Sequence, residues 1–208
     1  MFNHDPRIIS KQLYKLKKYS LYENTGSEKK IEKFAELIAK IHAQDMSQEI
    51  LKIYNVEWVI KQACEIRDVK YREDIISALG TMSQIEVHNA PVKNLKFLAW
   101  DIIQSDWQKD YQSGRAGSCA WDIASIINTA NDPQFSEIFL ESYLRHGGEK
   151  PTLVELYAKL YYVKVLEAIK SYDFENIMQI TREIINDIIF KTNIISYETL
   201  LKLNITGY

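Results

Sequence analysis

The sequence predicts a mainly α-helical protein with a small β-hairpin insertion around residues 84–107. Apolar residues recur at helical spacing through most of the chain, which favours amphipathic helices. Only seven glycines and four prolines occur in 208 residues, so few positions interrupt these helices. Between 84 and 107 the helical period is lost: apolar and polar residues alternate, the run LKFLAWDII is almost wholly apolar, and Pro91 is incompatible with a continuous helix.

The composition restricts the class of protein. Hydrophobic residues make up 46% of the chain, enough for a sizeable core, and this content argues against disorder. A net charge of −2 provides no basic field for nucleic acid. Cys64 and Cys119 lie too far apart to signal a zinc site or a disulfide framework. Neither a leader-like apolar segment nor an 18-residue apolar run occurs, so we expect a cytoplasmic protein with no membrane partner.

The first half of the chain predicts four amphipathic helices. A stripe over residues 7–22 is followed by a clear helix over 28–44, for which Ser27 is a good N-cap. His42 ends the apolar stripe of that second helix and is expected to be a hydrogen-bonded core histidine. Two further helices are predicted over 47–67 and over 71–80, the latter ending at Gly80.

Local signals predict the helices of the second half. One helix contains WDIASIINTA; another begins at Asp132-Pro133 and ends at Gly147-Gly148. Thr152 and Glu155 form a capping-box pattern for a long helix to about Lys170, and helices beginning near 173 and 196 follow it. Without a repeat or a convincing linker, the chain is expected to be a single domain over residues 1–208, with 1–27 as an N-terminal helical extension.

Polar residues that could perform chemistry gather between Val87 and Ala124. Several short patterns inside and beside this stretch follow one another along the chain: FAELIAKIH at 34–42, His88-Asn89 with Asn94, Asp106-Trp107, WDIA at 121–124, and Phe139-Leu140-x-x-Tyr143. In order and spacing they resemble the C-terminal lobe of the aminoglycoside phosphotransferase and choline kinase family. The resemblance covers roughly residues 30–170 and implies a helical kinase-like C-lobe.

The resemblance implies a role for each polar residue. Phosphoryl transfer needs a carboxylate to accept the hydroxyl proton and oxygen ligands to hold Mg²⁺ against the phosphates. Asn94 and Asp106 match the metal ligands, His88 matches the residue that orients the catalytic loop, and Asp122 matches an aspartate that braces this loop. Asn89 stands where the family has its catalytic aspartate, and an amide cannot take up a proton at neutral pH.

Two departures from the family pattern lead to the functional hypothesis. The general base is replaced by Asn89, and residues 1–27 cannot form the nucleotide-binding lobe that precedes the C-lobe in the family. We therefore expect a degenerate, truncated phosphotransferase-like protein that acts as a scaffold. A protein or peptide partner, or a second copy of the chain, would cover the surface of the missing lobe. No cofactor is expected in that case.

Three alternatives stay open. The chain could be an active phosphotransferase for a small-molecule or peptide hydroxyl, using Mg²⁺ and ATP, with the nucleotide lobe supplied by a partner chain. It could be an unrelated α-helical interaction protein in which Asp106 and Asp122 are caps or turn residues. A catalytic pair of Cys119 with His88 has little support from a single cysteine.

Overall fold

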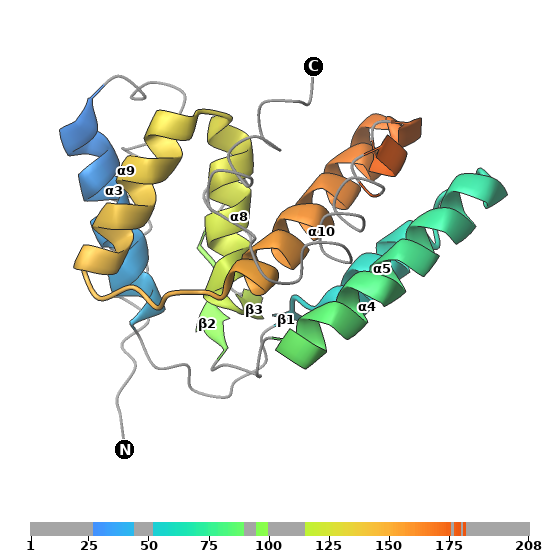
Figure 1. The fold of residues 1–208 in the computed structure, drawn as a ribbon, viewed down its shortest axis with the longest axis horizontal. Coiled ribbons are helices and arrows are strands. Elements are labelled where there is room, and N and C mark those ends of the chain that lie inside the picture. Colours follow the sequence, from blue (N-terminus) through green and yellow to red (C-terminus); the bar gives the residue numbers. More distant parts are fainter. Residues whose placement is uncertain are drawn as a thin grey trace. The chain divides into compact units, whose positions relative to one another are not determined.

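A computed structural model describes residues 27–43, 52–89, 95–99, 115–175, 177–179 and 181 (Figure 1). The fold is mainly α-helical with a small sheet, which confirms the fold class. The chain divides into two compact units, each made of two stretches of sequence. Unit 1 comprises residues 1–53 and 94–150, and unit 2 comprises residues 54–93 and 151–208. The single domain stays a prediction.

Among its described residues, unit 1 combines three helices with a three-stranded sheet. The helices are α3 (Glu28–His42), α8 (Cys119–Ala130) and α9 (Pro133–Arg145), and the strands are β1 (Lys52–Ile53), β2 (Lys96–Phe97) and β3 (Arg115–Gly117). β3 lies in the centre, parallel to β1 and antiparallel to β2. Ala116 of β3 is paired with Ile53 on one side and with Phe97 on the other. β2 therefore lies in the predicted interval, but its partner strand follows at 115–117.

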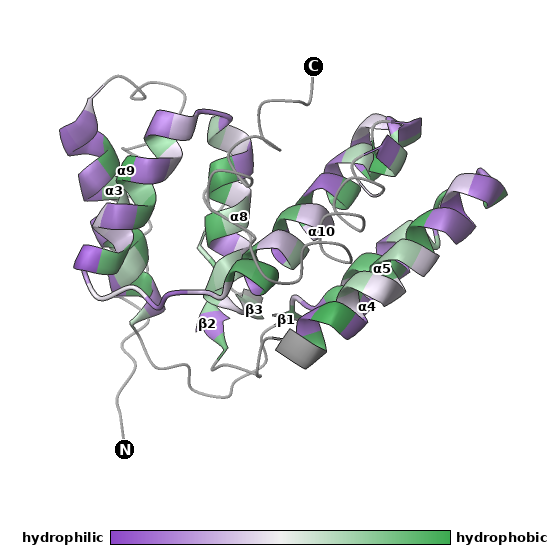
Figure 2. Cartoon of the chain, in the orientation of Figure 1, coloured by the Kyte–Doolittle hydropathy of each residue, from purple (hydrophilic) through white to green (hydrophobic). Residues whose placement is uncertain are grey.

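α3 packs along α9 (Figure 1), and the apolar stripe predicted for residues 28–44 is buried. Apolar and polar residues alternate around the helices, as amphipathic segments require (Figure 2). Aromatic rings fill the contact between the two helices. The ring centroids of Phe34 and Phe139 lie 5.8 Å apart, and the Phe139 ring stacks with those of Phe135 and Tyr143 on either side. Side chains of α3 that are buried here share the expected spacing: Ile31, Phe34, Ala35, Ile38 and Ile41.

The predicted beginning and end of α9 are confirmed. The Asp132 side chain accepts hydrogen bonds from the backbone N–H groups of Gln134 and Phe135, and Pro133 occupies the first turn. At the other end Gly147 has φ +82°, and the N–H of Gly148 donates to the Tyr143 carbonyl. A Cβ atom at Gly148 would overlap the Tyr143 ring, so this position requires glycine.

Unit 2 is a helical layer of α4 (Val56–Ala63), α5 (Val69–Asn89) and α10 (Leu153–Ser171). α10 packs against both other helices, and Thr152 caps it by accepting from the N–H of Glu155. Between α5 and α10, Lys159 forms an ion pair with Glu86, and the Tyr162 hydroxyl donates to the same carboxylate over 3.1 Å. The polar contact lies at the edge of an apolar core that includes Ile75, Leu79, Met82, Tyr157, Leu160 and Tyr161.

Two of the predicted helices have wrong boundaries. α5 continues through Gly80 to Asn89, so residues 84–89 are helical and not part of a strand. The reason is tertiary packing: Ile75, Leu79 and Met82 continue one buried stripe past the glycine. The helix predicted over 47–67 is interrupted, because residues 52–53 form β1 and Asn55 caps a shorter α4. The residues predicted as helical at 7–22, and those after 181, lie outside the described part of the chain.

Candidate functional site

The structure describes the five candidate residues to different extents. Asn94 and Asp106 lie outside the described residues, so their convergence on a metal ion stays a prediction. His88 and Asn89 are the last two residues of α5, and the structure describes their backbone only. The sequence places them in the non-helical interval 84–107; this is wrong, because the helix extends to Asn89. Asp122 is the candidate whose side chain can be placed.

Asp122 lies in the first turn of α8 and is 2% exposed. Ser118 begins this helix by accepting a hydrogen bond from the N–H of Ala120, and the helix is then buried on most sides. The Oδ2 atom of Asp122 accepts the backbone N–H of Ala99 over 2.7 Å and lies 3.1 Å from Nε2 of His42. One carboxylate oxygen therefore links α8 to the residues that follow β2 and to the end of α3.

His42 is the last residue of α3, and both of its ring nitrogens have partners. Besides the Asp122 contact, Nδ1 lies 2.9 Å from the Tyr143 hydroxyl on α9. An ionised carboxylate only accepts hydrogen bonds, so it selects the His42 tautomer that carries its proton on Nε2. Nδ1 then accepts a hydrogen bond from the Tyr143 hydroxyl. The prediction that His42 is a hydrogen-bonded core histidine is confirmed, since it is 2% exposed.

Tyr143 completes the network from the side of α9. Burial, together with the neighbouring Cys119 and Asp122, raises the pKa of its hydroxyl far above the usual value, so it remains a donor. The Tyr143 ring and the His42 imidazole pack edge to face, with their ring centroids 5.6 Å apart. Cys119 is also buried, with Sγ 3.6 Å from the Glu149 carbonyl oxygen. A thiol enclosed in this way is poorly placed to meet a substrate.

The sequence does not predict the contacts among His42, Asp122 and Tyr143. His42 is 80 residues from Asp122 and 101 residues from Tyr143 along the chain. No local spacing signals such long-range pairs. The one usable signal is that each residue occupies the buried side of an amphipathic helix, where a polar group requires a hydrogen-bonding partner. We call these three residues, with the Ala99 N–H, the buried network.

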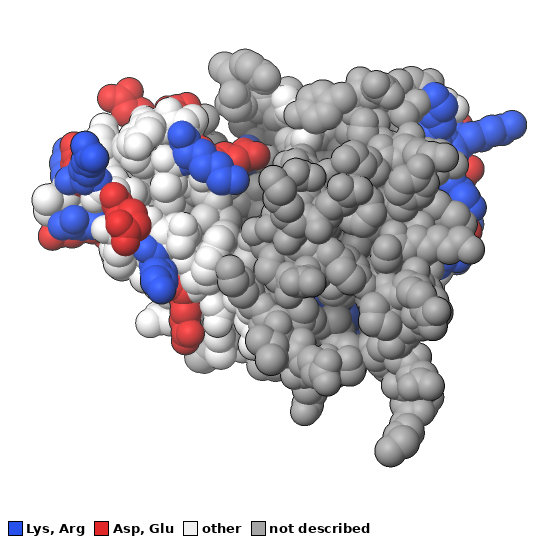
Figure 3. Space-filling view, turned by 180° about the vertical axis from the view of Figure 1, so that it is seen from behind, with Lys and Arg blue, Asp and Glu red and all other residues white. Residues whose placement is uncertain are grey.

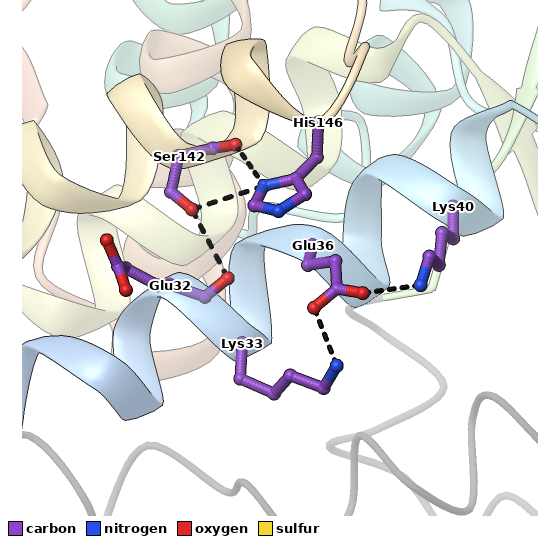
Figure 4. Close-up of polar contacts among 6 residues, drawn as sticks. All are labelled: Glu32, Lys33, Glu36, Lys40, Ser142 and His146. Carbon is purple, nitrogen blue, oxygen red and sulfur yellow. Dashed lines mark hydrogen bonds and ion pairs between the residues drawn. The ribbon is translucent and has the colours of Figure 1, made fainter.

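The outer surface of α3 has a different character. Glu36 forms ion pairs with Lys33 and Lys40 on the outer face of the helix (Figure 4). Nζ of Lys33 lies 2.6 Å from Oε2 of Glu36, and Lys40 contacts the other carboxylate oxygen. These lysines lower the pKa of the Glu36 carboxyl to about 2, chiefly through the hydrogen bond from Lys33 and then that from Lys40. Basic and acidic side chains are interspersed on the described surface in the rear view, as expected for a solvated face (Figure 3).

The end of α9 is also tied to α3 through Ser142. Its hydroxyl donates to the Glu32 carbonyl over 3.3 Å, and Nδ1 of His146 donates to the Ser142 carbonyl over 2.8 Å (Figure 4). Arg145 adds an ion pair with the Glu32 side chain. These contacts hold α3 and α9 together. They do not place a nucleophile beside a general base.

A metal site needs several ligand side chains close together. Within the described ranges, no three His, Cys, Asp or Glu side chains come together to hold a metal ion. The Asp122 oxygen that faces the network already accepts two N–H groups, so it does not fit a role as a magnesium ligand. The helices in the described part of the chain are each too short or too polar to cross a membrane.

No protein-family model matches the chain, and no curated protein or solved structure matches it either. The resemblance to the aminoglycoside phosphotransferase and choline kinase family therefore continues to rest on sequence motifs alone.

Proposed function

We propose that this chain is a non-catalytic scaffold, a degenerate phosphotransferase-like helical protein that binds a protein or peptide partner or a second copy of itself. The observation that carries the proposal is the amide of Asn89, at the position where the resemblance calls for the catalytic aspartate. Asp122, the candidate carboxylate whose side chain the structure describes, is enclosed and engaged with two N–H donors. A carboxylate in that position supports the fold, in keeping with the bracing role that the resemblance implies for Asp122.

The residue at the position of the general base supports the same proposal. Asn89 has a carboxamide where proton transfer would need a carboxylate. Its backbone belongs to the last turn of α5, whereas the resemblance calls for an extended catalytic loop. Both observations argue against an active phosphoryl-transfer centre at His88 and Asn89.

The proposed partner is a macromolecule of the cytoplasm. The chain has a net charge of −2, which gives no attraction to nucleic acid. Binding to another protein or peptide, or self-association, uses surface complementarity and needs neither ATP nor Mg²⁺. The proposal therefore excludes a cofactor requirement.

Calorimetric titration with Mg²⁺-ATP separates this proposal from the alternative, an active phosphotransferase whose nucleotide lobe is supplied by a partner chain. The purified wild-type chain is titrated up to millimolar nucleotide, with Asp106→Ala as the matched variant and Glu141→Ala, on the exposed face of α9, as a control. We expect no saturable heat with any of the three. Saturable binding to wild type and to Glu141→Ala that is lost in Asp106→Ala would overturn the proposal.

A further inference from the structure

We draw no further inference here: the strongest candidate, the aromatic patch of Tyr71, Tyr172 and Phe174 where α5 begins and α10 ends, is a partly exposed aromatic surface in which Tyr172 alone of the three is largely exposed, and nothing among the described residues shows what covers it.

Discussion

Asp122 shows how a single side chain can hold several elements in place. Its Oδ2 accepts an N–H from Ala99 and lies within hydrogen-bond distance of His42, whose other nitrogen meets Tyr143. All three side chains are buried, so water cannot replace a lost partner. The carboxylate thereby connects α3, α8, α9 and the residues after β2, which explains a charged residue at this position without invoking chemistry.

Removing the carboxylate is expected to destabilise unit 1 strongly. Asp122→Ala leaves two buried N–H groups without their acceptor, at a cost of about 1–3 kcal/mol each. Asp122→Asn keeps one oxygen for both donors and should lose less. Urea unfolding followed by circular dichroism measures the difference, with Glu141→Ala expected to stay within about 0.5 kcal/mol of wild type. If Asp122→Ala is as mild as Glu141→Ala, the network does not support the fold.

At the scale of whole helices, two glycines have opposite roles. Gly148 follows α9 at a point where the Tyr143 ring leaves no room for a Cβ atom, whereas Gly80 lies inside α5 with no atom within 4 Å of a Cβ. The first glycine ends a helix and protects the position of Tyr143. The second is a weak point in a helix that its neighbours hold together.

These roles predict substitutions of opposite sign. Gly148→Ala should destabilise the protein by about 1–3 kcal/mol, because the new methyl group displaces the Tyr143 ring. Gly80→Ala should stabilise it by about 0.5–1 kcal/mol, since alanine favours the helix and meets open space. Thermal unfolding of the two variants beside wild type checks both. Shifts of the melting temperature in the same direction would contradict the geometry at one of the two sites.

The ion pairs of Glu36 on α3 predict a small pH-dependent contribution to stability. The folded-state pKa of Glu36 is lowered to about 2, so this contribution is present above the unfolded pKa near 4.5 and is lost as the pH falls toward 2. Because Lys33 and Lys40 are exposed, screening keeps it below about 1 kcal/mol.

The corresponding measurement compares wild type with Glu36→Gln in urea unfolding between pH 7 and pH 3. The difference in the free energy of unfolding between the two proteins should be largest near neutral pH. It should decrease as the pH falls, and it should also decrease in high salt. Glu141→Gln, which lacks such a pair among the described contacts, should show no comparable trend. A difference in the free energy of unfolding that increases on acidification would contradict the stabilising role of these ion pairs.

The elements differ in how far sequence could predict them, because some helix boundaries are set by neighbouring residues and others by contacts with distant helices. α9 was predictable at both ends, because Asp132, Pro133 and Gly147 act on the backbone next to them. α5 was not, because Gly80 looks like a stop while Met82 and Glu86 are held by contacts outside the helix, Glu86 by its ion pair with Lys159 on α10. Local chemistry is visible in sequence, and the packing that overrides it is not.

For the molecule as a whole, the candidate site was predictable only in part. Sequence identified His42 as a core histidine through its place on an apolar stripe. The resemblance implied that Asp122 braces the catalytic loop, and that role stays a prediction. Sequence could not join the two residues, since they are 80 positions apart. Asn94 and Asp106 lie outside the described residues, and their role as a metal pair stays a prediction.

The size of the protein in its native surroundings tests the central claim most directly. The chain would be followed by antibody through gel filtration of a gently lysed extract of its own cells, beside the purified protein. We expect elution well above the mass of one chain in the extract. If the purified protein also elutes there, the partner is a second copy; if it elutes as a monomer, the partner is another protein. A monomer in both samples, across the concentrations tested, would contradict the proposed scaffold role.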